Sequence, residues 1–504
     1  MRRITAFAGT AAVLTPLLLM NAGSASAAAS SSLTVSTIGR DGRSVSSRPQ
    51  AVNVKTHDLY YLTSGKAAKL PKGSYDVIVD VFNTRDGTDT LGAKRVTVSG
   101  GSKTTIDARQ GHAVKAALSP AAPSGYDQLF TVDLCTTEGS GDVGAWAGTG
   151  TLFVIPSSLS TVELAYGSTW TPESGDGRSP VYVGAGVHKK GLPSGLSTTF
   201  HQSSLASLKV TARRGPETGR SNVEITRNSS DTCQASSARV DATATLPYGF
   251  TAHLTGGSWQ VSETADDFVY GPTHQYSAGK SYGITLNRAV WGPSGGLPYT
   301  WGSGHRLYFG DIGMFTDPVL GTPGTATTTY KLTKAGKSLS TKSHQPVIKG
   351  AGWYTLTESA TRHPLHKLAA DASSSKATVS MHFYADPKAT EQVRGYLTRF
   401  TPVALDSSDR ARPGATTTVD LGMLRNRSAD PEVRQLSDTA KKVRVWASFD
   451  GGRTWHAQTV KHPGGTWTTT VHDPKSGTVS LRSTVDDSHG DSTTTTVVNA
   501  YTVS

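Results

Sequence analysis

Short alternating stretches of apolar and polar residues, separated by closely spaced turn residues, constrain this chain more than any other feature. After a turn at Pro71 and Gly73, one such stretch places four apolar side chains on a single face of a strand: Tyr75, Val77, Val79 and Val81. Gly, Ser and Thr are abundant, and the periodicity of long helices is missing. The pattern predicts an all-β protein of about three or four tandem β-sandwich modules.

The first 27 residues have the pattern of an export signal. Arg2 and Arg3 precede an apolar core from Ala6 to Met20, and Ala25-Ser26-Ala27 has the small residues of a cleavage site. The core is short for a membrane span, and Pro16 lies inside it. We therefore expect a secreted, extracellular protein that does not span a membrane after cleavage. An uncleaved N-terminal anchor is the alternative.

Changes in composition divide the rest of the chain into four predicted regions. These are a small β-sandwich at 33–118, a β-rich region at 119–255, an aromatic-rich β region at 256–435 and a C-terminal β-sandwich at 436–504. The first boundary is placed at the linker Ser119-Pro120-Ala121-Ala122-Pro123. The turn and strand near Tyr75 resemble those of prealbumin-like and carboxypeptidase-regulatory-type sandwiches.

A motif near the C-terminus matches the Asp-box pattern S-x-D-x-G-x-T-W through five residues: Ser448, Asp450, Gly452, Thr454 and Trp455. The Asp450 carboxylate can accept backbone hydrogen bonds within its own turn, and Gly451 and Gly452 can adopt the positive φ angles of a tight hairpin. We predict a structural turn, with ligand contact as the alternative. A sialidase propeller would need several such boxes at regular spacing, and the sequence contains one.

The only two cysteines, Cys135 and Cys233, lie in the second region. An exported protein meets an oxidising environment, so a disulfide that closes a loop of about 100 residues is expected. A catalytic thiol is the alternative, although neither cysteine lies in a recognisable nucleophile motif. The pair is therefore predicted to stabilise the fold.

The whole chain has a formal net charge of +12. A positive charge favours anionic partners such as cell-wall polymers. Lys and Arg are scattered, however, with no run longer than a pair such as Lys189-Lys190. We therefore predict solubilising surface charge and no specific recognition of nucleic acid, with binding to anionic wall polymers as an alternative.

Several segments, in their order along the chain, resemble the C-terminal accessory region of large secreted subtilisin-family serine peptidases of actinomycetes. In the last two regions they are the runs Tyr282–Pro293, Gly310–Asp317 and Trp353–Thr357 and the Asp-box module with Val479–Arg482. In the first region they are Leu33–Val35, Arg40-Asp41-Gly42, Leu70–Tyr75 and Thr105–Arg109. The resemblance implies tandem β modules that accompany a peptidase.

The catalytic half of such peptidases is missing from this sequence. A subtilisin-type triad needs a Ser nucleophile, a His base and an orienting Asp. The His-Gly-Thr-His and Gly-Thr-Ser-Met-Ala elements that mark the His and the Ser do not occur, and turns such as Asp41-Gly42 and Asp86-Gly87 are not followed by them. No catalytic residue is therefore carried over from the family.

Metal sites have weak support in the sequence. His363 and His366 flank Pro364, which forbids the helical spacing of a zinc motif, and no Glu accompanies them. Calcium is the one cofactor considered, with carboxylates in turn loops as its ligands: Asp266-Asp267, Asp311 with Asp317, and Asp486-Asp487. None of these has the alternating carboxylates of an EF-hand loop, so no metal ligand is assigned.

Aromatic residues gather in the third region and offer a candidate ligand platform, formed by Trp291, Tyr299, Trp301, Tyr308 and Phe309. Core packing is the alternative role for these side chains. We expect a secreted, non-catalytic β protein that binds or scaffolds at the cell surface or in the medium, with an extracellular protein or a cell-wall glycan as its partner. A divergent, glycosidase-like hydrolase with paired carboxylates is a further alternative.

Overall fold

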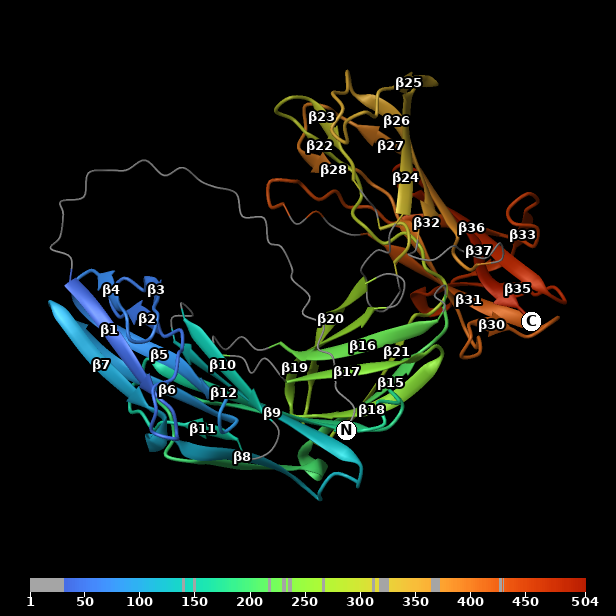
Figure 1. Ribbon diagram of the computed structural model, residues 1–504. Coiled ribbons are helices and arrows are strands. Elements are labelled where there is room, and N and C mark those ends of the chain that lie inside the picture. The colour runs from blue at the N-terminus through green and yellow to red at the C-terminus, as the bar shows by residue number, and fades with distance from the viewer. Residues whose placement is uncertain are drawn as a thin grey trace.

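The computed structural model (Figure 1) confirms the all-β prediction with several separate sheets. Within the part of the chain that it describes, the only helical elements are three single 3-10 turns: η1 (Ala108–Gln110), η2 (Gln202–Ser204) and η3 (Pro463–Gly465). The description covers residues 31–137, 141–147, 151–215, 219–228, 233, 238–264, 268–310, 313–316, 326–363, 372–425, 428 and 430–504. The predicted signal peptide lies outside these residues.

Two sheets form the N-terminal end, drawn in blue and cyan in Figure 1. The first has the order β4 (Ala67–Leu70), β1 (Ser31–Ile38), β7 (Gly101–Asp107). The second has the order β14 (Leu196–His201), β8 (His112–Ser119), β11 (Leu152–Val154), β6 (Thr88–Val98), β5 (Gly73–Asn83), β2 (Gln50–Asn53), β3 (Leu59–Tyr61). The predicted stripe of Tyr75, Val77, Val79 and Val81 on β5 packs against Leu33 and Val35 of β1 in one buried cluster.

Two further sheets follow in the middle of the chain. One has the order β10 (Asp142–Ala147), β9 (Tyr126–Thr136), β12 (Val162–Pro172), β13 (Val181–His188), β18 (Tyr248–Leu254), β15 (Ala206–Ala212), β21 (Ser281–Leu286). The other has the order β17 (Arg239–Thr245), β16 (Arg220–Arg227), β19 (Gly257–Thr264), β20 (Phe268–Tyr276). Apolar residues of both sheets, such as Val210 and Ile225, share one core.

Three sheets form the C-terminal end. A small one has the order β23 (Arg306–Tyr308), β22 (Tyr299–Trp301), β28 (Glu391–Gln392). The largest runs β25 (Lys337–Leu339), β24 (Ala326–Lys334), β26 (Gly352–Arg362), β27 (Lys376–Ala385), β37 (Ser492–Val503), β36 (Gly477–Asp487), β32 (Ala440–Ser448), β33 (His456–Gln458), and β30 (Arg410–Ala411) pairs with β37. The last has the order β29 (Leu397–Pro402), β31 (Thr416–Leu424), β35 (Trp467–His472), β34 (Val460–Lys461).

Strand pairing crosses each of the three predicted region boundaries. β8 of the first region pairs with β14 of the second, and β15 of the second pairs with β21 of the third. β27 of the third region pairs with β37 of the C-terminal one. The sheets are therefore shared between the predicted regions, because partner strands that lie far apart in the sequence complete one another's backbone hydrogen bonds.

The second sheet is covered on both faces. On one face, Val77 and Val79 pack against the first sheet, while on the other Ile78 and Leu91 pack against Phe130 and neighbours of the β9–β12 sheet. Because β5 is covered on both faces, the run Tyr75–Val81 is buried almost without interruption.

Candidate functional site

The Asp450 carboxylate is the centre of the turn after β32. Its Oδ1 accepts hydrogen bonds from the backbone N–H groups of Arg453 and Thr454, both at 2.9 Å, and from the Ser448 hydroxyl at 2.8 Å. Its Oδ2 accepts one from the Thr454 hydroxyl at 2.6 Å. These donors, the Thr454 hydroxyl first, hold the pKa of Asp450 well below its usual range.

Trp455 attaches the same turn to β36, the neighbouring strand of the same sheet. Gly451 and Gly452 have φ angles of 72° and 89°, which L-residues with side chains rarely adopt. The Trp455 Nε1 donates a hydrogen bond of 2.9 Å to the Gly452 carbonyl, and the Arg482 guanidinium lies 3.9 Å from the centre of the Trp455 ring. The polar atoms of the motif thus bind one another, which is the geometry of a structural turn.

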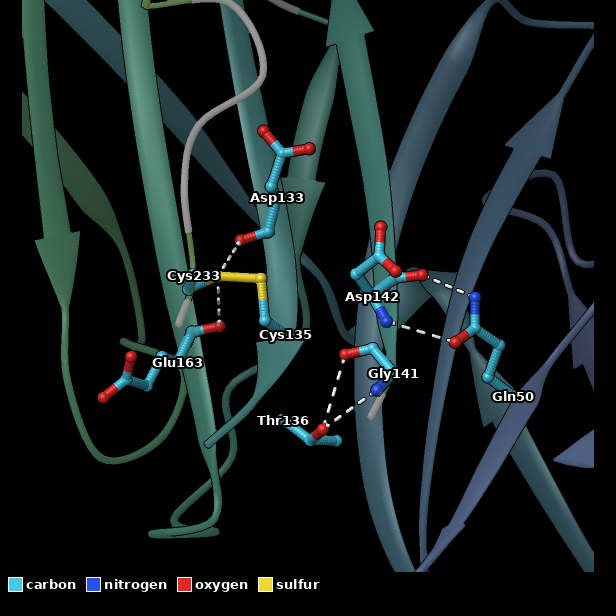
Figure 2. The surroundings of a disulfide bond; sticks show 8 residues. All are labelled: Gln50, Asp133, Cys135, Thr136, Gly141, Asp142, Glu163 and Cys233. Atoms are coloured by element: carbon cyan, nitrogen blue, oxygen red, sulfur yellow. Dashed lines mark hydrogen bonds between the residues drawn. A yellow bond between two sulfur atoms is a disulfide. The ribbon is translucent and has the colours of Figure 1, made fainter. Parts of the chain in front are cut away.

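Cys135 and Cys233 form the predicted disulfide (Figure 2). Cys135 lies on β9 and Cys233 in the connection between β16 and β17, so the bond joins two sheets. The Cys233 sulfur lies 3.3 Å from the Asp133 carbonyl oxygen and 3.6 Å from that of Glu163. Since both sulfurs are bonded to each other and nearly buried, neither serves as a nucleophile.

Figure 2 also shows how β10 is held to β2 beside this disulfide. The Gln50 amide nitrogen donates to the Asp142 carbonyl, and the Gln50 Oε1 accepts from the Asp142 backbone N–H at 3.1 Å. This amide bridge between segments about 90 residues apart connects the first and second predicted regions.

The structure brings Tyr299, Trp301 and Tyr308 of the candidate platform together. The rings of Tyr299 on β22 and Tyr308 on β23 stack with centroids 4.9 Å apart and planes 5° apart. Trp301 lies edge-on to Tyr308 at 6.3 Å. Trp291 is only 2% exposed and packs in the core with the Arg362 guanidinium 5.7 Å from its ring centre, so it offers no surface for a ligand.

Tyr299 and Tyr308 border a pocket of about 290 Å³. The other residues that line it are Gly296, Leu297, Phe309, Gly310, His344 and Gln345. Burial raises the pKa of the Tyr299 hydroxyl, which keeps this group neutral and able to donate a hydrogen bond. The pocket therefore combines two parallel aromatic rings with the polar side chains of His344 and Gln345.

Phe309, a predicted platform residue, lines the pocket, whereas His344 was missed as a site residue by the sequence prediction. His344 packs against both Tyr330 and Phe309, with centroid distances of 4.7 Å and 5.8 Å, and its carbonyl accepts a 3.1 Å hydrogen bond from the Phe309 N–H. The segment that carries His344 follows β25 and returns to β23 through long-range contacts. No local motif in the sequence signals this contact.

The metal predictions fall largely outside the described residues, which include none of Asp266, Asp267, Asp311, Asp317 and His366. Among the residues that are described, no group of three or more His, Cys, Asp or Glu side chains is arranged to hold a metal ion. Asp486 instead binds Arg444 with both carboxylate oxygens, each at 2.8 Å. The Asp487 Oδ1 accepts from the backbone N–H groups of His489 and Asp491.

One pair of carboxyl groups with shifted pKa values was not predicted. Asp80 on β5 and Asp89 on β6 lie mostly buried in direct contact, and burial together with the hydrogen bond that Asp80 donates to Asp89 raises the pKa of Asp80 far above its usual range. Glycosidases hold their two carboxyl groups at least about 5 Å apart to admit the reacting atoms. A pair in contact, with Asp89 6% exposed, has the geometry of a shared proton in the core.

Within the described residues, no helix is long and apolar enough to cross a membrane.

No protein-family model matches this chain, and no curated protein sequence matches it. Among solved structures, the Bacillus anthracis TIE protein is similar at 12% sequence identity over 51% of this chain and 49% of its own length, with a TM-score of 0.13. A second, the pilus adhesin SpaC from Lactobacillus rhamnosus GG, has 12% identity over 71% of this chain and 55% of its own, with a TM-score of 0.11. The chain thus spans about half the length of these proteins, and neither superposition is close enough to support an argument about function.

Proposed function

We propose that this chain is a secreted, non-catalytic β protein that binds a sugar unit of an extracellular glycan in the aromatic pocket between β22 and β23. The observation that carries the proposal is the parallel pair Tyr299 and Tyr308 at the edge of a pocket of about 290 Å³. This volume lies at the small end of the range for ligand sites, which suits a single sugar ring.

The lining of the pocket favours a neutral, polyhydroxylated ligand. Sugar rings have apolar C–H faces that pack on aromatic rings, while their hydroxyl groups need donors and acceptors at the rim. Tyr299 and Tyr308 supply the rings, and Gln345 and His344 supply neighbouring polar groups. Of the described residues that line the pocket, none is an Asp or a Glu, which favours binding over glycoside hydrolysis.

Two further observations support the extracellular setting and the accessory role. The Cys135–Cys233 disulfide is of the kind that persists in oxidising compartments, in agreement with the export-signal pattern of residues 1–27. The segment resemblance to the accessory region of secreted subtilisin-family peptidases, together with the missing triad motifs, suggests that the chain scaffolds or presents a partner while chemistry takes place elsewhere.

A calorimetric or NMR titration of the mature protein with methyl glycosides of glucose, mannose, galactose and N-acetylglucosamine tests the proposal. We expect at least one glycoside to bind, and Tyr308→Ala to weaken that binding about tenfold or more, which corresponds to about 1.4 kcal/mol. Tyr61→Ala is the matched control, since Tyr61 is a 73% exposed tyrosine on β3. No binding, or equal weakening by both variants, would contradict the proposal.

A further inference from the structure

The outer face of the largest sheet is covered with hydroxyl side chains. On β26, β27 and β37 the inward residues, such as Leu356, Met381 and Val497, are fully buried in the core. The alternate residues point the other way and are partly or fully exposed to solvent. Nine of these outward residues are Ser or Thr: Thr355, Thr357, Ser359, Thr361, Thr378, Ser380, Ser492, Thr494 and Thr496.

Strand register aligns these hydroxyls in rows across the sheet. One row runs Thr357, Ser380, Thr494, Thr484 over four strands, and the next runs Ser359, Thr378, Thr496. Within a row neighbouring strands are about 4.8 Å apart, and successive rows are about 6.8 Å apart along the strands. The eleven residues of β26 therefore span roughly 35 Å, which is long enough for several consecutive sugar units.

The hydroxyls of a row hydrogen-bond to one another and still have donors and acceptors left to bind a ligand. The pair Thr357 and Ser380 lies at 3.0 Å and the pair Thr484 and Thr494 at 2.9 Å. Each contact uses one proton, so the second hydroxyl of the pair retains a proton that it can donate outward, and both oxygens retain lone pairs. Thr side chains also have restricted χ1 rotation, which lowers the entropy lost when a ligand orders them.

Aromatic side chains border one end of the rows. Trp353 and Tyr384 lie opposite each other on β26 and β27, and they are 40% and 43% exposed. The His382 ring stacks on Trp353 at 5.0 Å with an interplanar angle of 11°, which fixes the indole beside the hydroxyl rows. The two rings lie 5.7 Å apart and form one exposed aromatic pair at this end of the rows.

The hydroxyl rows contain few charged side chains although the chain has a net charge of +12. Along the outward positions of β26, β27 and β37 the one Lys is Lys376, at the start of β27, and these positions contain no Arg, Asp or Glu. On the flanking strands, Lys331 lies opposite Thr357, Arg482 lies opposite Thr496, and Arg444 and Asp486 neutralise each other. Because the rows themselves consist of hydroxyls, their contacts are neutral hydrogen bonds, which suit an uncharged ligand rich in hydroxyl groups.

We infer that this face, formed by β26, β27 and β37 with Trp353 and Tyr384 at its end, binds an extended, uncharged polysaccharide chain. The hydroxyl rows bind sugar hydroxyls, and the two aromatic rings pack on a sugar face. The inference extends the proposed glycan binding to a polymer, and the face shares no residue with the pocket near Tyr308. A substitution can therefore abolish binding at one of the two sites and leave binding at the other intact.

Depletion of the mature protein from solution by insoluble cellulose, chitin and β-mannan tests this inference. We expect retention on at least one of these polymers, with less than about a twofold change between low and high salt, because no ion pairs form. The double variant Thr357→Ala/Ser380→Ala and the single variant Trp353→Ala are expected to weaken polymer retention about tenfold, whereas their binding of a methyl glycoside in the pocket stays within about threefold of the wild type.

The double variant Thr418→Ala/Thr470→Ala is the matched control. These two exposed threonines pair across β31 and β35 on a different sheet, so their replacement also removes one cross-strand hydroxyl pair. Circular dichroism and thermal unfolding verify that every variant is folded. Absent retention, equal loss in the control, or binding confined to anionic polymers and abolished by salt would each overturn the inference.

Discussion

The guanidinium of Arg482 on β36 lies 3.9 Å from the ring centre of Trp455, at the end of the Asp450 turn. A cation over an indole face contributes about 0.5–2 kcal/mol, depending on how far it is desolvated. We therefore expect Trp455→Ala to lower the free energy of unfolding by about 1–3 kcal/mol, including the lost packing of a half-buried ring. Urea denaturation measures the change. Trp455→Phe should retain part of the stability that Trp455→Ala loses. Equal stability of Trp455→Ala and wild type would contradict a stabilising role of Trp455.

Asp450→Asn should make the stability of the protein less sensitive to acid. Hydrogen bonds from Thr454 and Ser448 hold the pKa of Asp450 in the folded state below the ordinary value of an aspartate. Its contribution to stability is therefore present above that ordinary value and is lost as the pH falls through the folded pKa. We expect the wild type to be more stable than Asp450→Asn at pH 6 and the difference to shrink below about pH 3. Thermal unfolding across this range measures the trend. A difference that grows on acidification would contradict the assignment.

Asp80→Asn should stabilise the protein at alkaline pH. The folded pKa of Asp80 is raised above 3.8, so its favourable contribution is greatest in acid and is lost as the pH rises through the folded value. Asn keeps the hydrogen bond to Asp89 without the charge, and we expect a gain of about 1–3 kcal/mol at pH 8 and little change at pH 5. The exposed Asp127→Asn on β9 is the control. A loss of stability at pH 8 would count against a shared proton.

Cys135→Ser/Cys233→Ser should lower the free energy of unfolding by about 2–5 kcal/mol, because the disulfide closes a loop of 98 residues in the unfolded chain. Chemical denaturation of the variant and of reduced wild type measures this loss, and the two should agree. Sugar binding should persist below the melting temperature, since neither cysteine lines the aromatic pocket. Loss of binding in a folded variant would show that the disulfide has a second role.

Local features of the fold follow from the sequence, and its long-range pairings do not. The alternation around Tyr75 and Val77 is sufficient to predict β5 and its buried face. Nothing local indicates that β27 pairs with β37, more than 100 residues later, and the predicted boundary at 435/436 divides that sheet. Such pairing depends on which apolar faces match after collapse, and that information is spread over the whole chain.

In the candidate site, too, the sequence predicts local features but not long-range contacts. Aromatic content alone identifies Tyr299 and Tyr308, but it also selects Trp291, because an indole in the core and one on a surface have the same sequence signature. His344 enters the pocket through contacts with β23, and the hydroxyl rows exist only once the register of three strands is known. The sequence therefore predicts which residue types a site contains, but it does not predict which of these residues lie together in the folded chain.

Binding without turnover is the central claim, and one combined assay tests it most directly. The mature protein is incubated with the glycan that retains it and separately with casein, while retention, released reducing sugar and released peptides are followed over time. We predict stable retention that depends on the Thr357 and Ser380 pair, with no release of sugar or peptide above the buffer control. Steady release of reducing sugar or of peptides, lost in a variant of a single carboxylate or serine, would contradict the account.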